Sequence, residues 1–590
     1  MSDSKRRNTF SVPAAGLVVA IFLGIGSSAI SAQVAPPKSA TDSSAKTARN
    51  AVPRPKLVVM LVVDQMRADY VDKFIGQWSG GLKRLATEGA WFHDAAYPYA
   101  ATETCVGHST ISTGAFPATH GMVANAWWDR DSQKMVACTS DPKAKNVGYG
   151  GLAASGGDSA WRMETPAFAE ELKFQSAGPT RVVTFSLKAR AAITMAGHQA
   201  DAAVWLDGKT GAWTTSSAYQ VAAFVEEYAK TYPVKADMGK TWALSLPTGE
   251  YLYGEKATGA VAPEGWDLTF PHALRGKGGN SEADPEYIEQ WASSPYADTA
   301  LTKLAESAVD SLQLGRGKGT DYLGVSYSSV DYVGHEFGPR SREIQDILLR
   351  LDRDLGELFT HLDKTVGRGN YVVALSADHG VVPVPEDMES TGADAGVLHM
   401  RELQERMEKA LEDLNYPKPS IARIAGSDVY FAPEVYQRLK ADPAAMKAVL
   451  AAGNAQLGVA AIYTTEEVQG RPATDNPIQK AFAEGYFAGR SGDLFIAPKA
   501  YWLMDSTPAG KTRDEGTGHG TPHNYDQRVP VLLMGWGIRS GNYYREVTPA
   551  DIAPTFAHLC GITLSSLDGK VLSEALQSAS PADRRQLHVL

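Results

Sequence analysis

The chain has 590 residues, of which 44% are hydrophobic, and its formal net charge at pH 7 is −10. A chain of this length can bury a large core and is long enough for two or three domain-sized units. Lys and Arg do not form runs beyond the first few residues, so a nucleic-acid-binding surface is not expected. An anionic substrate would therefore have to be attracted by local cations.

The first 32 residues have the pattern of a secretory signal peptide. A basic start at residues 4–7 is followed by a mostly apolar run at 12–26 and by small residues up to Ala32. That run is short for a bilayer span of ~20 residues, so an uncleaved membrane anchor is the less favoured alternative and no stable anchor is expected after cleavage. Residues 33–56 are polar and contain prolines, which predicts a linker. We expect a periplasmic or secreted protein.

Cysteine occurs at three positions, Cys105, Cys138 and Cys560, and none of them forms a CxxC spacing. The chain therefore does not rely on a disulfide framework, and the sequence does not assign any single bridge. Thiolate zinc sites are not expected. A metal ion bound here should have histidine and carboxylate ligands.

Five apolar runs predict buried strands, at residues 57–64, 181–188, 321–331, 371–378 and about 529–537. Their hydrophobicity is continuous rather than alternating, which is typical of strands covered on both faces. This predicts an α/β fold with a mainly parallel sheet sandwiched between helices. Residues 341–363 have helical spacing, and we expect one face of this helix in the core: Ile344, Ile347, Leu348, Leu351, Leu355, Leu358 and Leu362.

The hydrophobic runs weaken between residues 383 and 499, which predicts an inserted subdomain or an elaborate loop system. The catalytic domain would then comprise residues 57–382 and 500–590. A second irregular region, from Gly148 to about Trp291, mixes glycine-rich turns with strands. No internal repeat is evident.

Polar residues follow several of the predicted strands. In open parallel sheets ligands bind beyond the carboxyl ends of the strands, so these residues can converge although they are far apart in sequence. Asp378 and His379 are adjacent at such an end, so that one could face a ligand while the other is structural. Three carboxylates and three imidazoles make up the candidate set: Asp64, Asp331, His335, Asp378, His379 and His519. This mixture of ligands fits two zinc ions, with manganese or iron as alternatives.

The stretch TETCVGHSTISTG, from Thr102 to Gly114, offers candidates for a nucleophile. Taken alone, its hydroxyl residues would be helix caps. Two metal ions, however, can activate a threonine hydroxyl and stabilise a leaving oxygen, and phosphoryl transfer is the reaction that best uses such a site. Lys188 and Arg190, two residues apart at a predicted strand end, would lie on the same side and could both reach one phosphate. Asn125 is a candidate neutral donor.

Seven motifs in order resemble the alkaline phosphatase superfamily, in particular its threonine-nucleophile, PafA-type phosphomonoesterases. They extend from Leu57 to Leu576: VVDQMR, TETCVGHSTISTG with PATHGMVANAWWD, SLKARAAITMAGHQADAAVWLD, SVDYVGHEFGP, SADHG, HGTPHNYDQRVP and TPADIAPTFAHLCGI. The resemblance selects Thr104, four residues before His108, as the nucleophile and leaves Thr102 as a bystander.

The resemblance also implies a ligand set for two zinc ions per chain. One ion would be held by Asp64, Asp378 and His379 with Thr104 beside it, and the other by Asp331, His335 and His519. Asn125, Lys188 and Arg190 match the phosphate-contacting positions of the family.

The implied function is that of an exported, zinc-dependent alkaline phosphatase acting on phosphate monoesters. Thr104, at a helix N-terminus that favours negative charge, would attack phosphorus in line to give a phosphothreonine, which water then hydrolyses. The alternative is a phosphodiesterase or nucleotide pyrophosphatase with the same ligands. Lys188 and Arg190 favour the monoesterase, because a monoester presents one more charged oxygen.

Two further alternatives carry less support. A sulfatase requires a Cys or Ser followed by x-Pro-x-Arg, whereas Cys105 is followed by VGHS, so this class is excluded. A non-enzymatic binding or structural protein is the remaining alternative. The absence of bound zinc in the purified protein would favour it.

Overall fold

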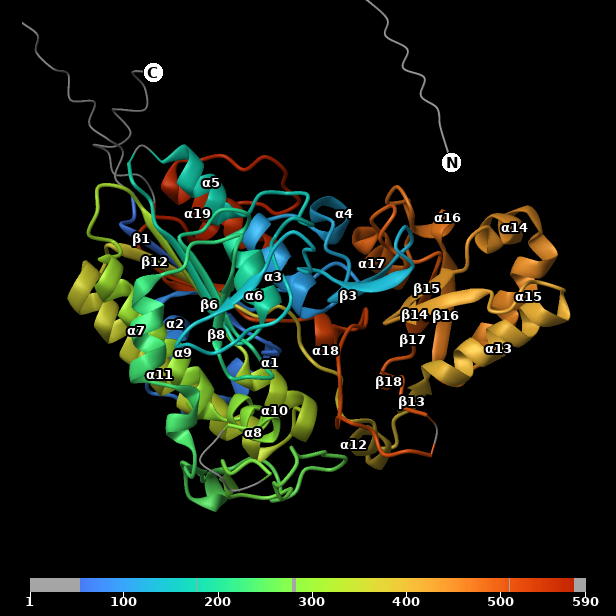
Figure 1. The fold of residues 1–590 in the computed structure, drawn as a ribbon, viewed down its shortest axis with the longest axis horizontal. Helices are drawn as coiled ribbons and strands as arrows, with labels where there is room; N and C mark the ends of the chain where they lie inside the picture. Colours follow the sequence, from blue (N-terminus) through green and yellow to red (C-terminus); the bar gives the residue numbers. More distant parts are fainter. Residues whose placement is uncertain (1–53, 177, 278–282, 509, 578–590) are drawn as a thin grey trace, which may run out of the picture. The chain divides into compact units, whose positions relative to one another are not determined.

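The computed structural model describes residues 54–577 apart from residues 177, 278–282 and 509 (Figure 1). The predicted signal peptide and most of the predicted linker lie outside the described residues. Within the described part of the chain, no helix combines the length and the hydropathy that spanning a bilayer requires.

A ten-stranded sheet forms the centre of the fold, in the order β20-β2-β19-β12-β1-β11-β6-β7-β8-β5. Five adjacent strands in its middle run parallel to one another. They are β12 (Tyr371–Ser376), β1 (Leu57–Val63), β11 (Asp321–Tyr327), β6 (Val182–Ser186) and β7 (Ala202–Leu206). The predicted α/β fold with a mainly parallel sheet is confirmed.

The flanking strands are shorter, and most of them pair antiparallel. They are β19 (Val531–Gly535), β2 (Ala90–Phe92) and β20 (Gly541–Tyr543) on one side, and β8 (Trp213–Ser216) and β5 (Asn146–Gly148) on the other. Only β2 and β20 pair parallel with each other. The irregular region from Gly148 to about Trp291 therefore supplies three strands, β6, β7 and β8, to the main sheet.

The sheet separates two hydrophobic cores. Successive side chains of β1 enter them alternately: Leu57, Val59, Leu61 and Val63 enter one core, and Val58, Met60 and Val62 enter the other. All seven residues are buried, which explains why the strand shows continuous hydrophobicity.

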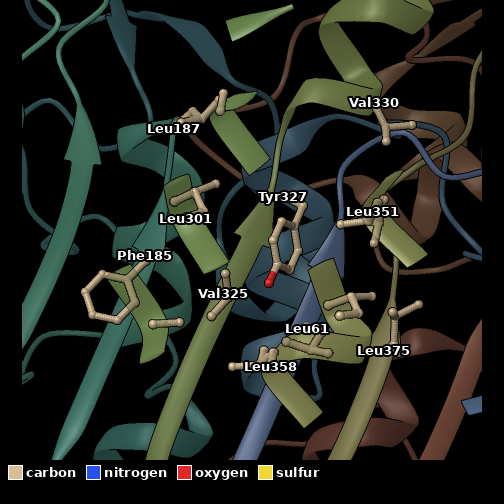
Figure 2. Close-up of a cluster of buried hydrophobic side chains, with 14 of the residues drawn as sticks. Leu61, Phe185, Leu187, Leu301, Val325, Tyr327, Val330, Leu351, Leu358 and Leu375 are labelled. Atoms are coloured by element: carbon tan, nitrogen blue, oxygen red, sulfur yellow. The ribbon is translucent and has the colours of Figure 1, made fainter. Parts of the chain in front are cut away.

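Different helices cover the two faces of the sheet. Those of the first core are α1 (Asp69–Phe74), α2 (Gly81–Glu88), α7 (Ala223–Thr231), α8 (Pro285–Ala292), α9 (Pro295–Leu312), α10 (Ser329–Phe337) and α11 (Arg342–Leu362). Those of the second are α3 (Thr104–Thr113), α5 (Phe168–Gln175), α6 (Ala189–Ala196) and α19 (Ile552–Cys560). Figure 2 shows Leu351 and Leu358 of α11 packed with the strand residues Leu61 and Leu375. The helix expected at 341–363 is confirmed, and all seven of its predicted core residues are buried.

A second, four-stranded sheet has the order β14-β15-β17-β16 and its own hydrophobic cluster. Its strands are β14 (Ile421–Ala425), β15 (Asp428–Phe431), β16 (Val459–Thr464) and β17 (Leu494–Pro498), and α13 (Met400–Asp413), α14 (Val435–Ala441) and α15 (Pro443–Asn454) pack on them. These elements lie within residues 383–499. The pairing of β13 (Gly396–His399) with β18 (Trp502–Asp505) crosses the predicted boundary. That this segment is an inserted subdomain stays a prediction.

The remaining elements are short. They are α4 (Pro117–His120), α12 (Pro385–Ser390), α16 (Thr465–Val468), α17 (Pro477–Gly485) and α18 (Asn524–Gln527), the hairpin of β3 (Ala126–Asp129) and β4 (Lys134–Ala137), and the pair of β9 (Thr241–Trp242) and β10 (His272–Ala273).

Two of the predicted strands end early because side-chain hydrogen bonds interrupt them. The strand expected to reach Asp331 ends at Tyr327, because the Asp298 carboxylate accepts hydrogen bonds from the Ser329 N–H and hydroxyl where α10 begins. The strand expected to reach Lys188 ends at Ser186, whose hydroxyl accepts the Lys188 N–H at 3.1 Å. A hydroxyl that bonds the backbone two residues on turns the chain out of the sheet.

Candidate active site

Four adjacent strands bring the predicted site residues to one edge of the sheet. Asp64 directly follows β1, and Asp378 and His379 come shortly after β12. Asp331 lies on α10 after β11, and Lys188 follows β6. Because β12, β1, β11 and β6 are neighbours and parallel, their carboxyl ends meet, as expected for the ligand-binding edge of such a sheet.

One cluster consists of Asp64, Asp378 and His379, all fully buried. The His379 Nε2 atom lies 3.5 Å from Asp64 Oδ1 and 3.4 Å from Asp378 Oδ2. These three buried atoms have no hydrogen-bond partner among the described residues. Unpaired buried polar atoms are rare, and three that face one another make this cluster a candidate cation site.

The expectation that only one of Asp378 and His379 faces the cluster is wrong. β12 ends at Ser376, so the alternation of side chains along a pleated strand no longer applies at residues 378 and 379. The His379 Nε2 atom lies near carboxylate oxygens of both Asp64 and Asp378, so both side chains belong to the cluster.

Asp331, His335 and His519 form a second cluster. His335 lies one turn after Asp331 on α10, with its Nε2 atom 3.3 Å from Asp331 Oδ1, and the His519 Nε2 atom is 4.0 Å from the same oxygen. Asp331 also lies within reach of Asp64 and His379: one ligand atom from each of these three residues falls within 4.8 Å of the others. The two clusters therefore adjoin, with Asp331 between them.

Backbone carbonyls orient the three imidazoles. The Nδ1 atoms of His379, His519 and His335 lie 2.9, 2.8 and 2.9 Å from the carbonyl oxygens of Gly380, Thr102 and Thr517. A carbonyl only accepts, so each Nδ1 carries the proton and each Nε2 faces the carboxylates. Burial lowers the pKa of both His379 and His519, which keeps their Nε2 lone pairs free.

His335 differs from the other two histidines. Burial alone would lower its pKa, but Asp331 and Glu515 raise it well above the ordinary value. The negative charge of Asp331 and Glu515 thus favours positive charge at this position. A metal ion at this position would supply that positive charge.

Lys188 supplies a cation inside the carboxylate cluster. Its Nζ atom donates to Asp64 Oδ2 at 2.7 Å and also to Asp331. Burial, together with the charges of Asp331 and Asp378, still raises the pKa of Asp64 well above its ordinary value. Three buried carboxylates thus face one buried ammonium group, which is the electrostatic condition for binding more cations.

Lys188 and Arg190 were predicted at the end of a strand, but they lie where α6 begins and contact different groups. Lys188 is the N-cap of α6 and Arg190 lies in its first turn, so strand geometry does not apply. Lys188 contacts the carboxylates, whereas the Arg190 Nη2 atom lies 3.4 Å from the Thr104 hydroxyl oxygen.

Thr104 is the first residue of α3. The N-terminus of a helix favours negative charge through its free N–H groups. The hydroxyl of Thr102 is turned elsewhere and donates to the Thr521 carbonyl at 3.1 Å. Asn125 lies beside α3, with its Oδ1 atom 2.8 Å from the Cys105 nitrogen. The structure therefore brings Thr104, Arg190 and Asn125 to the start of one helix.

The sequence did not identify Gln65, which links the two clusters. Its backbone N–H donates to Asp378 Oδ1 at 3.1 Å, and its side-chain Nε2 donates to Asp331 Oδ1 at 2.8 Å. It has a φ of +67°, which is uncommon for a residue with a side chain and is found at functional sites. A Cβ on Gly334 would lie 1.7 Å from Gln65 Oε1, so a larger residue there would displace the Gln65 side chain. The position directly after a strand-terminal Asp was the only available signal.

The structure also assigns the disulfide that the sequence left open. Cys105 and Cys138 are bonded, and Cys560 is free and buried. The bridge joins the residue after Thr104 to the end of the β3–β4 hairpin.

Comparison with known proteins shows the family to which this chain belongs. Residues 58–525 match the family described as type I phosphodiesterase / nucleotide pyrophosphatase, and the chain belongs to that family. Alkaline phosphatase PafA of Elizabethkingia meningoseptica is 34% identical over 538 residues, which cover 89% of this chain and 95% of that protein. Alkaline phosphatase PhoV of Synechococcus elongatus is 33% identical over 543 residues, 89% of this chain and 94% of that protein.

A solved structure agrees with these relatives. The crystal structure of wild-type alkaline phosphatase PafA superposes with a TM-score of 0.79 at 32% identity, covering 90% of this chain and 100% of that one. The predicted membership of the alkaline phosphatase superfamily, with its PafA-type enzymes, is confirmed.

Proposed function

We propose that the chain is an exported, zinc-dependent alkaline phosphatase that hydrolyses phosphate monoesters through a phosphothreonine at Thr104. The class itself, a phosphoric monoester hydrolase, follows from alkaline phosphatases that match this chain over nearly their whole length. The observation that carries the finer proposal is the position of Thr104, which begins α3 beside Arg190 at the edge of the sheet where the ligand clusters lie.

The residues present fit two zinc ions. Asp64, Asp378 and His379, with Thr104, would hold one, and Asp331, His335 and His519 would hold the other. The unpaired atoms Asp64 Oδ1, Asp378 Oδ2 and His379 Nε2 support this assignment, and mixed carboxylate and imidazole donors are typical of zinc. When bound, such ions lower the pKa of a nearby hydroxyl and stabilise negative charge on attacking and leaving oxygens.

Thr104 and the donor groups around it carry out the steps of the proposed reaction. The Thr104 oxygen attacks phosphorus, the bond from phosphorus to the ester oxygen breaks, and the phosphoryl group is transferred to threonine. Water then attacks phosphorus and breaks its bond to the Thr104 oxygen, which regains a proton as inorganic phosphate leaves. Arg190 and Asn125 donate hydrogen bonds to the nonbridging oxygens, and the free N–H groups of α3 favour their charge.

The positive charge of Lys188 can balance the negative charge of the carboxylates or of the phosphate. In the structure its ammonium group neutralises Asp64 and Asp331. If Asp64 and Asp331 held metal ions, they would need the Lys188 ammonium less, and Lys188 could donate to the phosphate. This accounts for a lysine at a position that the family uses for phosphate contact.

The second candidate is a phosphodiesterase or nucleotide pyrophosphatase, which the family description includes. Arg190 beside Thr104, with Lys188 nearby, favours the monoesterase because a monoester has one more charged oxygen than a diester.

Lys188→Ala combined with Arg190→Ala distinguishes the two candidates. We expect kcat/KM for an aryl phosphate monoester to fall about a hundredfold to a few thousandfold, since ~3 to 5 kcal/mol of transition-state stabilisation is lost, and kcat/KM for a bis-aryl diester to fall much less. Arg181→Ala, at the opposite end of β6, is the matched control and should change neither rate. A larger fall for the diester would overturn the monoesterase assignment, and an equal fall with lost metal would indicate damage to the ligand clusters.

A further inference from the structure

Asn125 is tied to the first turn of α3 from both sides of Thr104. The carboxylate of Glu103, the residue before Thr104, accepts the Asn125 backbone N–H at 2.6 Å. The backbone N–H of Cys105, the residue after Thr104, donates to the Asn125 side-chain oxygen at 2.8 Å. Cys138 donates its N–H to the Asn125 carbonyl at 2.9 Å and is disulfide-bonded to Cys105.

These contacts determine which way the Asn125 amide faces. The Cys105 N–H can only donate, so the atom that meets it has to be the amide oxygen. The amide NH2 group is then directed away from the Cys105 nitrogen and has no acceptor among the described residues. Asn125 therefore presents two free donors next to the first turn of α3.

The backbone around Asn125 belongs to a small hairpin. Asn125 directly precedes β3, Cys138 directly follows β4, and the ladder pairs Ala126 with Ala137. The hairpin forms a two-stranded sheet of its own, outside the ten-stranded sheet. Both ends of the hairpin are therefore held next to α3. Glu103 binds the end that precedes β3, and the disulfide binds the end that follows β4.

We propose that Glu103 is a positioning residue, which holds Asn125 so that its amide donates to the phosphate of the substrate. This inference rests on the proposed function. A carboxylate next to a phosphate site repels the anionic substrate, so a benefit from Glu103 has to come through Asn125. Within the described chain the Glu103 carboxylate makes no other hydrogen bond, and a bond from an N–H group to an ionised carboxylate is a strong one.

A double-mutant cycle tests this role. In the wild-type background, Glu103→Ala should lower kcat/KM for an aryl phosphate monoester about tenfold and raise the inhibition constant of inorganic phosphate by a similar factor. In the Asn125→Ala background the same substitution should change both values less than twofold, because the side chain that Glu103 positions is already gone. Glu103→Gln keeps an acceptor oxygen and should retain activity within about threefold of the wild type.

The matched control is Asp568→Ala. The Asp568 carboxylate accepts the Phe116 N–H at 2.8 Å just beyond the other end of α3, so the substitution removes the same kind of bond, from a backbone N–H to a carboxylate, away from Thr104. It should leave the phosphate inhibition constant unchanged in both backgrounds.

The outcomes separate this proposal from the proposed function. If Glu103→Ala lowers activity by the same factor with and without the Asn125 side chain, or leaves the wild-type values unchanged, Glu103 does not act through Asn125. If Asn125→Ala alone leaves the phosphate inhibition constant unchanged, Asn125 is not a phosphate contact and that part of the proposed function is wrong as well.

Discussion

Thr102 and Thr104 are two residues apart, but their hydroxyl groups have different surroundings. The Thr104 oxygen lies beside Arg190 at the start of α3, whereas the Thr102 hydroxyl donates to the Thr521 carbonyl. A nucleophile needs space for the phosphorus atom and a group that activates it. Of the two hydroxyls, only that of Thr104 lies beside a cationic side chain at a helix N-terminus.

We therefore expect Thr104→Ala to reduce monoester kcat at least a thousandfold, because the group that accepts the phosphoryl is removed. Thr102→Ala should stay within a few-fold of the wild type. Steady-state kinetics check this, with the metal content of both variants measured to show that the ligand clusters are intact. The reverse order of effects would mean that the nucleophile is wrongly assigned.

At the level of single residues, the sequence predicted which side chains come together but not how all of them lie. Asp64, Asp331 and Asp378 could be found because each comes after a buried strand. The role of Gln65 depends on contacts with residues 266 and 313 positions away and on an uncommon backbone conformation, neither of which leaves a local pattern. Lys188 and Arg190 were expected on one side of a strand end, but they lie at the start of α6, where the rule of alternating side chains does not hold.

The helix α3 is seated directly on the loop that carries Asp378 and His379. Gly107, one turn into the helix, faces this loop, and a Cβ at that position would lie 2.1 Å from the Asp378 carbonyl oxygen. The absence of a side chain at Gly107 thus allows the backbones of α3 and of the loop that carries Asp378 and His379 to touch. Any side chain at this position has to separate them.

Gly107→Ala should therefore lower the free energy of unfolding by about 1–3 kcal/mol, as overpacking does, and lower monoester kcat/KM at least tenfold, since the helix and the loop shift relative to each other. Gly76→Ala is a suitable control, because a Cβ there meets nothing within 4 Å. Thermal unfolding and kinetics measure the two effects. Wild-type behaviour of Gly107→Ala would show that α3 does not rest on Asp378.

Among the secondary-structure elements, the long and strongly patterned ones were predictable. The helix at 341–363 and the strands of the parallel core show their burial in the sequence. The flanking strands β2, β5 and β20 have three residues each, which is too short for a periodicity to be recognised. The ends of β6 and β11 were misplaced because side-chain hydrogen bonds from Ser186 and Asp298 end these strands.

At the scale of the whole molecule, the negative charge of the protein opposes the binding of an anionic substrate. The chain carries a net charge of −10, and its site concentrates three buried carboxylates where an anionic phosphate has to bind. Metal ions convert this negative region into one that attracts the substrate. The site should therefore be inactive whenever the ligand clusters are empty.

Exhaustive chelation is expected to abolish activity, and added zinc is expected to restore it, because the six His and Asp ligands then regain their ions. Elemental analysis should confirm the loss and the return of two zinc ions per chain, and circular dichroism should show that the fold persists. Full activity after verified metal removal would contradict the two-metal assignment.

The most direct test of the central claim is to trap the phosphoryl group on the enzyme. The enzyme is mixed with an aryl phosphate monoester, quenched in acid during turnover and digested, and the peptide that contains residues 102 and 104 is sequenced by mass spectrometry. We expect a phosphate on Thr104 of the wild type and of Thr102→Ala. The peptide from Thr104→Ala should carry none. A phosphate on Thr102 or on another residue, or turnover by Thr104→Ala at the wild-type rate, would contradict it.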